Sequence, residues 1–214
     1  MSLNQRVIIA LPKGRVYDQA KELLGRAGIA IPGSENGSRK LVFADESGRY
    51  DFVPLKPIDI PVYVESGALD AGIVGTDILR EQDSDVYEPL DLRIGKCRLS
   101  LAAPRGAAIS YDQHLRIATK YPRTAEEFFL SRNVHVQIVK LEGSVEIAPL
   151  LGLADAIVDL VETGRTLREN GLDILSEIKA ITSKLIVNRT AMKIKSKAIN
   201  RLIASLDTVV FANH

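Results

Sequence analysis

Short runs of β-branched and other apolar residues alternate along this chain with stretches whose apolar residues recur at helical spacing. The run from Arg6 to Leu11 is predicted to be a buried strand. From Val16 to Ala27 the apolar residues share one helical face, and Gly28 follows as a stop signal. Further strands are predicted at 71–74, 116–119, 136–141 and 156–161. Such alternation is typical of layered α/β folds with mainly parallel strands.

Two long strand-like segments suggest that the chain forms two lobes. The long segment 94–103 and the paired strands within 174–187 are interpreted as crossover strands that carry the chain from one lobe to the other and back. We therefore expect a first lobe made of residues 1–92 plus 177–214. The second lobe, residues 93–176, would be inserted into it.

Composition excludes several classes of protein. The 214 residues include 28 Lys and Arg against 27 Asp and Glu, a net charge of +1, which gives no reason to expect a nucleic-acid partner. No signal sequence or apolar run of about 18 residues is present, so we expect a cytoplasmic protein without a membrane partner. Cys97 is the single cysteine and the three histidines are scattered, so no metal site built from protein side chains is expected.

The most informative local pattern is Thr163-Gly164-Arg165-Thr166, which follows an apolar strand and opens a predicted helix. Ligands of parallel α/β sheets bind at the carboxyl ends of strands, and unpaired N–H groups at a helix start suit a phosphate. Gly164 would let the backbone approach an anion, and the flanking hydroxyls and Arg165 would add donors. The alternative is an ordinary turn with Thr166 as the helix N-cap.

Two acidic residues lie just upstream of this loop. Asp155 and Asp159 lie four residues apart, on either side of Ala156-Ile157-Val158, and a carboxylate at the end of a strand can accept hydrogen bonds from ribose hydroxyls. A phosphate loop with a neighbouring carboxylate suggests a phosphorylated ribose. The alternative for each residue is a solvated surface acid.

Two other turns after strands carry polar residues. Lys13-Gly14-Arg15 places two cations beside a helix start, which is mildly unfavourable unless an anion such as a polyphosphate binds there. Thr76-Asp77 starts another predicted helix, and Arg39-Lys40 precedes a strand. Simple helix capping and solvated cations remain the alternatives for these residues.

Longer motifs resemble the ATP phosphoribosyltransferase family. Related patterns occur from about residue 7 to residue 190, in the order in which the family has them. They are Leu11-Pro12-Lys13-Gly14-Arg15, Ser38-Arg39-Lys40-Leu41, Asp59-Ile60-Pro61-x-Tyr63-Val64, Asp70-Ala71-Gly72-Ile73-Val74-Gly75-x-Asp77, and the signature Glu146-(x5)-Gly152-x-Ala154-x-x-Ile157-x-Asp159-Leu160-x-x-Thr163-Gly164-x-Thr166-Leu167.

The resemblance implies a fold, a reaction and a partner. The fold would have two α/β lobes of the periplasmic-binding-protein type II kind, with the active site in the cleft between them. The reaction would join adenine N1 of ATP to C1 of phosphoribosyl pyrophosphate (PRPP) and release pyrophosphate, with Mg²⁺ carried by the substrate. No room is left for a C-terminal regulatory domain, which resembles the short form of the family. That form implies a dimer within a hetero-octamer, with a regulatory subunit similar to histidyl-tRNA synthetase.

The resemblance also implies which residues bind each substrate. Those matching the PRPP site are Glu146, Asp155, Ala156, Asp159, Thr163, Gly164, Arg165 and Thr166. Those matching the ATP site are Lys13, Gly14, Arg15, Arg39 and Asp77. No general base is implied, and Lys13 and Arg15 are the candidates for stabilising charge on the leaving group.

Two other interpretations compete with this one. The same two-lobed fold serves non-catalytic solute receptors and effector domains, although neither a secretory signal nor a helix-turn-helix is found here. A phosphoribosyltransferase of the Rossmann-like type also places an acid before a T-G-x-T loop. That interpretation leaves the N-terminal motifs unexplained.

Overall fold

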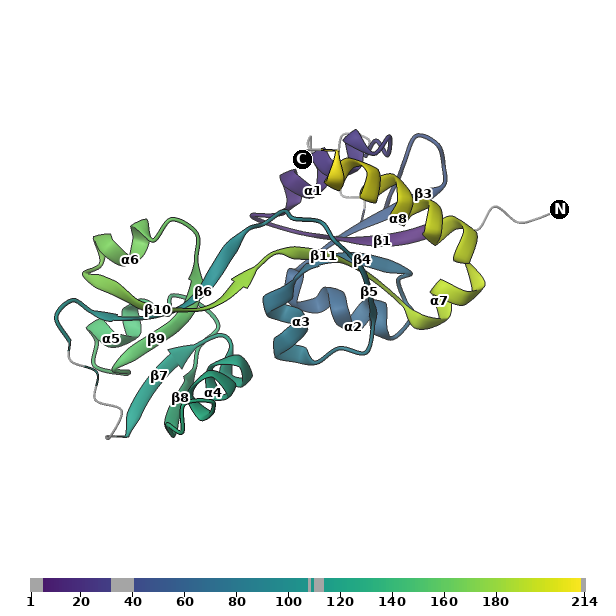
Figure 1. Ribbon diagram of the computed structural model, residues 1–214. Coiled ribbons are helices and arrows are strands. Elements are labelled where there is room, and N and C mark those ends of the chain that lie inside the picture. Colours follow the sequence, from purple (N-terminus) through teal and green to yellow (C-terminus); the bar gives the residue numbers. More distant parts are fainter. Residues whose placement is uncertain (1–5, 32–40, 108, 110–113, 213–214) are drawn as a thin grey trace. The chain divides into compact units, whose positions relative to one another are not determined.

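A computed structural model describes residues 6–31, 41–107, 109 and 114–212. The chain divides into two compact units, Met1–Gly95 with Thr182–His214, and Lys96–Ile181 (Figure 1). Each unit is built on its own β-sheet with helices on both faces. The two-lobed α/β fold expected from the sequence is therefore confirmed.

The first unit surrounds a six-stranded mixed sheet in the order β2-β3-β1-β4-β11-β5. Its elements are β1 (Val7–Pro12), α1 (Tyr17–Arg26), β2 (Phe43–Ala44), β3 (Tyr50–Leu55), the 3₁₀ helix η1 (Pro57–Asp59), α2 (Ile60–Glu65), β4 (Ala71–Gly75), α3 (Thr76–Gln82), β5 (Tyr87–Asp91), β11 (Ser183–Val187), α7 (Arg189–Ile194) and α8 (Ser196–Phe211). Helices α1 and α8 pack on one face of the sheet, and α2 and α3 pack on the other.

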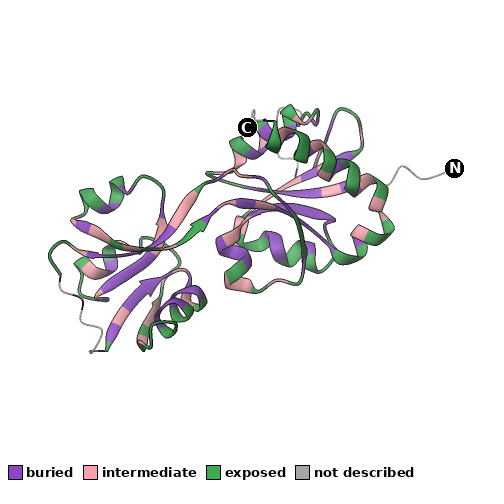
Figure 2. Ribbon diagram, in the orientation of Figure 1, coloured by how far each residue is buried: buried purple, intermediate pink, exposed green. Residues whose placement is uncertain are grey.

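The second unit surrounds a five-stranded sheet in the order β10-β6-β9-β7-β8. Its elements are β6 (Cys97–Pro104), β7 (Leu115–Thr119), α4 (Pro122–Leu130), β8 (Val136–Lys140), α5 (Ile147–Leu150), β9 (Ala156–Val161), α6 (Arg165–Glu169) and β10 (Leu172–Ile181). The apolar cluster on one face takes in α4, and the cluster on the other face takes in α5 and α6. Figure 2 shows the buried residues concentrated on the central strands of both sheets.

The division between the units falls later in the chain than the sequence predicts. The predicted boundaries follow residues 92 and 176, whereas the observed ones follow Gly95 and Ile181. The reason is the antiparallel pairing of β6 with β10, whose register runs from Leu172 opposite Pro104 to Ile181 opposite Cys97. Because the two strands pair along their whole length, both belong to the second unit.

The prediction of mainly parallel strands is wrong, since both sheets are mixed. β1 is parallel to β3 and β4, and β7 is parallel to β8 and β9. β6 is antiparallel to β9, and β11 is antiparallel to β4 and β5. β5 and α7 were not predicted from the sequence. β5 contains Pro89 and is mostly exposed, so its strand pattern is weak.

Candidate functional site

The loop between β9 and α6 has a backbone conformation that favours glycine. Gly164 follows the end of β9 with φ +72° and immediately precedes α6. A Cβ atom at this position would lie 3.1 Å from Nη1 of Arg168, closer than such atoms normally approach. The turn buries Gly164 and leaves Thr163 and Thr166 exposed, so their hydroxyl groups are accessible to a ligand.

The interpretation of this loop as a turn capped by Thr166 is wrong. Helix α6 begins at Arg165, so Thr166 lies within its first turn. Gly164 occupies the N-cap position and has no side chain to cap with. Because α6 has only five residues, its dipole is small. Contacts to an anion would have to come chiefly from the amides and side chains of the loop.

The loop forms one wall of a cavity of about 400 Å³ in the second unit. Of the residues predicted to bind PRPP, six line this cavity: Glu146, Asp159, Thr163, Gly164, Arg165 and Thr166. Lys120 and Ser144 also line it, and neither was predicted from the sequence. Lys120 directly follows β7, which runs parallel to β9, so its place at the end of a predicted strand was the available signal.

Asp159 is the half-buried carboxylate of this cavity. It lies near the end of β9, and its Oδ1 accepts a hydrogen bond of 2.9 Å from the backbone N–H of Leu160. Burial raises the pKa of Asp159, and the charge of Glu146 adds to this effect. The N–H of Leu160 and the charge of Lys120 act in the opposite direction and favour the ionised form. Glu162 and Arg165 also line the cavity, which thus combines three acids with two basic residues.

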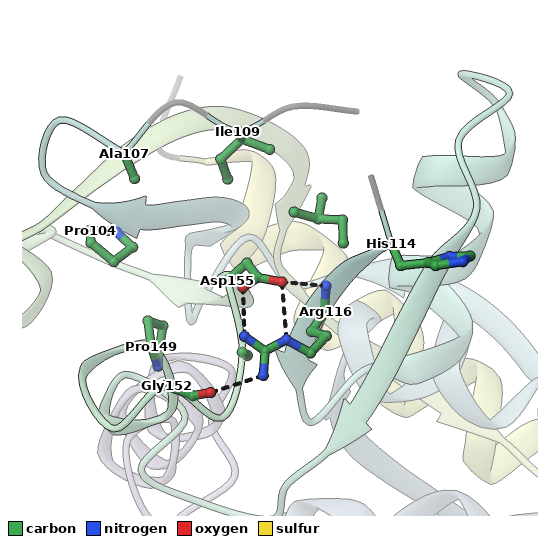
Figure 3. Close-up of a pocket in the computed structure, with 10 residues that line it drawn as sticks. Pro104, Ala107, Ile109, His114, Arg116, Pro149, Gly152 and Asp155 are labelled. Carbon is green, nitrogen blue, oxygen red and sulfur yellow. Dashed lines mark hydrogen bonds and ion pairs between the residues drawn. The ribbon is translucent and has the colours of Figure 1, made fainter. Parts of the chain in front are cut away.

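Asp155 and Ala156, also predicted to bind PRPP, do not lie in this cavity. Asp155 lines a separate cavity of about 500 Å³ with Arg116 and His114 (Figure 3). Its carboxylate accepts hydrogen bonds of 2.7 and 3.2 Å from the Arg116 guanidinium, whose Nη1 donates to the Gly152 carbonyl. Ala156 is buried in the opposite face of the sheet from the loop.

The reason for this correction is the length of β9. Asp155 precedes the strand and Asp159 lies near its far end. Four residues of extended chain separate their Cα atoms by about 13 Å. The two acids therefore share a face of the sheet but not a site.

The cationic turn Lys13-Gly14-Arg15 follows β1 in the first unit. The N–H of Lys13 donates to the Leu55 carbonyl at 2.8 Å, and Gly14 has φ +89°. Nη2 of Arg15 donates to the Gly95 carbonyl at 3.1 Å. All three turn residues are exposed. This arrangement anchors the backbone of the turn and presents two positive charges at the end of β1.

Asp77 lies at the start of α3 and is buried, 7% exposed. Its Oδ1 occupies the position that a Cβ at residue 75 would need, so glycine at that position accommodates the carboxylate. This packing limits how far Asp77 can reach toward a ligand. Arg39 lies outside the described residues.

The described part of the chain lacks two further kinds of feature. No group of three or more His, Cys, Asp or Glu residues there could hold a metal ion. None of the helices in that part has the length and apolar character needed to cross a membrane.

Comparisons with known proteins agree in one assignment. A family model described as ATP phosphoribosyltransferase matches residues 56–208. An ATP phosphoribosyltransferase of Oceanobacillus iheyensis is 51% identical over 206 residues, which cover 96% of this chain and 99% of the relative. One from Caldanaerobacter subterraneus subsp. tengcongensis is 49% identical and covers 95% and 97%.

Two solved structures resemble this chain, one in both sequence and fold and the other in fold alone. A complex described as ATP phosphoribosyl transferase (HisG:HisZ) from Thermotoga maritima contains a chain with 32% identity and a TM-score of 0.83, covering 97% of this chain and 98% of that one. The substrate-binding protein of an amino acid ABC transporter has a TM-score of 0.60 at 15% identity, covering 98% and 95%. The second likeness concerns the fold alone.

The sequence similarity over nearly the full length therefore favours the transferase over a solute receptor. It also favours this family over the Rossmann-like phosphoribosyltransferases. The chain belongs to the ATP phosphoribosyltransferase family, the pentosyltransferases that catalyse the first step of histidine biosynthesis.

Proposed function

We propose that the cavity beside the β9–α6 loop binds PRPP for transfer to ATP. Backbone amides of the loop, with the side chains of Thr163, Arg165 and Thr166, would hold the 5-phosphate. Asp159 and Glu146 would accept hydrogen bonds from the ribose hydroxyls. The observation that carries this proposal is the gathering of these residues around one cavity, although Glu146 lies far from the loop in sequence.

ATP would bind at the turn after β1. Lys13 and Arg15 present two exposed cations there, which suits a triphosphate or a departing pyrophosphate. Gly14 would let the backbone come close to the phosphates. Asp77 and Arg39 complete the set that the resemblance implies. Asp77 would act from its buried place at the start of α3 by orienting neighbouring groups.

The chemistry requires little proton transfer. The lone pair on adenine N1 attacks C1 of the ribose, the N1–C1 bond forms, and the bond from C1 to pyrophosphate breaks. Positive charge develops on the sugar ring and negative charge on the leaving group. Catalysis would then rest on alignment of the two substrates and on stabilisation of the pyrophosphate by Lys13 and Arg15.

Magnesium would arrive with PRPP rather than in a protein site. Mg²⁺ keeps several waters and binds phosphate oxygens readily, so pyrophosphate can carry it. The ion would neutralise charge on the leaving group when bound. The role of this chain's residues would be to hold the sugar and the phosphate.

The working assembly would include a second kind of subunit in the cytoplasm. The similar chain from Thermotoga maritima is described as part of a HisG:HisZ complex, which supports a regulatory partner. We expect dimers of this chain within a hetero-octamer, with the partner resembling histidyl-tRNA synthetase. Kinetic tests should therefore use the chain together with that partner.

Reciprocal substitutions test the two binding sites. Replacing Thr163 and Thr166 with alanine removes two exposed hydroxyls, and each hydrogen bond to a charged group contributes about 1.5–3 kcal/mol. The double variant should raise the KM for PRPP at least tenfold and leave the KM for ATP near its original value. Arg15→Ala should instead raise the KM for ATP, and it should also lower kcat because Arg15 is assigned to the departing pyrophosphate. Steady-state kinetics of pyrophosphate release, with the other substrate saturating, measures both constants.

Each variant serves as the control for the other. Thermal melting of both proteins checks that the fold is intact. If the loop variant changed neither constant, the assignment of the loop to PRPP would be rejected. If Arg15→Ala left the KM for ATP unchanged, Arg15 would be removed from the ATP site.

A further inference from the structure

Ser100 is a buried polar residue for which the fold provides no hydrogen bond. It lies in β6, its side chain is inaccessible to solvent, and its Oγ finds no partner among the described residues. Two other buried atoms share this condition, Oε1 of Gln82 and Nε of Arg98. In both of those residues another atom of the same group does form a bond: Gln82 donates to the Ile58 carbonyl, and Arg98 pairs with Glu177. The Ser100 side chain has no second polar atom that could form a hydrogen bond instead.

The strand register places Ser100 directly opposite Asp159. β6 and β9 are antiparallel, with Ser100 paired to Asp159 and Ala102 paired to Ile157. Ala102 and Ile157 both belong to the apolar cluster beneath α5 and α6. Because side chains alternate along a strand, Ser100 and Asp159 face the same side as this pair. Opposed side chains on one face have Cβ atoms about 4.5–5.5 Å apart, so rotation of the serine can bring Oγ to the carboxylate.

A further hydrogen-bond donor would stabilise the Asp159 carboxylate. Leu160 N–H occupies Oδ1, while Lys120 is the nearby cation and Glu146 is a second acid on the same cavity. Arg98, two residues from Ser100 on β6, is paired with Glu177. When a sugar displaces water from the cavity, the ionised carboxylate loses solvation and any hydrogen bond to it becomes stronger.

We infer that Ser100 is a positioning residue for sugar binding: when PRPP fills the cavity, the Ser100 hydroxyl, which has no partner in the described part of the free protein, rotates to donate a hydrogen bond to the Asp159 carboxylate and orients it toward the ribose. Ser100 does not touch the substrate, because its side chain is fully buried and does not line the cavity. The inference rests on the proposed role of Asp159. It explains why a hydroxyl occupies a core position at which a methyl group would fill nearly the same volume.

The test is a double-mutant cycle of Ser100→Ala and Asp159→Asn, measured on the chain in complex with its regulatory subunit. Ser100→Ala should raise the KM for PRPP about tenfold, leave the KM for ATP unchanged and not lower the thermal midpoint. In the Asp159→Asn background the same change should have little further effect, because Ser100 acts through Asp159. Ser176→Ala is the matched control, since β10 is separated from β9 by β6.

The outcomes separate this inference from the proposed function. If Asp159→Asn weakens PRPP binding but Ser100→Ala does not, only the role of Ser100 is overturned. Additive effects, or a fall in the thermal midpoint of Ser100→Ala, would also overturn it, since both indicate a role independent of Asp159. If Asp159→Asn leaves the KM for PRPP unchanged, the ribose assignment itself fails and the role of Ser100 fails with it.

Discussion

At the scale of single residues, two aspartates at the ends of one strand have opposite properties. Hydrogen bonds from the Arg116 side chain hold the pKa of Asp155 below its ordinary value. Burial raises the pKa of Asp159 at the other end of β9. The sequence alone does not distinguish the environments of these two aspartates. Their neighbours make Asp155 a partner in an ion pair and leave Asp159 available to a ligand.

The ion pair of Asp155 gives a prediction about pH. Because its pKa is lowered from 3.8 in the folded state, the stability it contributes is complete above about pH 4. That contribution is lost as the pH falls through the lowered value. Asp155→Asn should therefore be less stable than the parent at pH 7, and the difference should shrink below pH 4. Urea unfolding at both pH values measures it.

A suitable control for this experiment is Glu142→Gln. Glu142 pairs with Lys140 across 3.4 Å, but its side chain is 86% exposed. Solvent screens such a pair, so the substitution should change stability little at neutral pH. If Asp155→Asn behaved like this control, the pairing of Asp155 with Arg116 would contribute nothing measurable.

At the scale of elements, Asn188 joins two helices across the first unit. Its Oδ1 accepts hydrogen bonds of 2.9 Å from the N–H groups of Thr190 and Ala191 at the start of α7. Its Nδ2 donates to the carbonyls of Val64 and Glu65 at the end of α2. One buried side chain thus caps the N-terminus of one helix and adds a donor to the carbonyls at the C-terminus of another.

Replacing Asn188 should destabilise the protein strongly. Asn188→Ala removes the cap of α7 and the amide donor to the Glu65 carbonyl, while the Val64 carbonyl keeps its bond from the Gly67 N–H, so the free energy of unfolding should fall by about 1–3 kcal/mol. Asn188→Ser keeps an acceptor for the cap but loses the amide donor, so its loss should be smaller. Chemical unfolding of the three proteins gives the values. Equal losses for serine and alanine would mean that the contacts to α2, not the cap, dominate.

At the scale of the whole molecule, the two units differ in how the chain builds them. Lys96–Ile181 is one continuous segment with its own sheet and an apolar cluster on each face. The first unit needs both ends of the chain, because β11 pairs with β4 and β5, and α8 packs against α1.

This difference predicts that residues 96–181 fold when expressed alone. Since both apolar clusters of this unit are formed within the segment, it should give a native-like far-UV circular dichroism spectrum and a cooperative thermal transition. Residues 1–95 alone lack β11 and α8 and should not unfold cooperatively. A gradual, featureless melt of 96–181 would contradict the independence of the second unit.

Elements whose signals lie in neighbouring residues were predicted better than features that depend on pairing between distant segments. The helix expected from Val16 to Ala27 is observed as α1, Tyr17–Arg26, because its apolar face and terminal glycine are local signals. Mixed strand direction was missed, because it depends on which strands pair at long range. Helix α7 was missed although Asn188 is a strong cap, since no long apolar periodicity follows it.

The amino-acid sequence by itself determined the α/β alternation and the candidate loop after β9, because strand and helix periodicity and the chemistry of Thr163-Gly164-Arg165-Thr166 are properties of neighbouring residues. Only the tertiary structure decided which acids accompany that loop. In the folded chain, Glu146, Asp159 and Lys120 line the same cavity as the loop. Asp155 pairs with Arg116, and Ser100 lies opposite Asp159 in the strand register. These placements follow from strand length and register, which bring together residues that no local pattern connects.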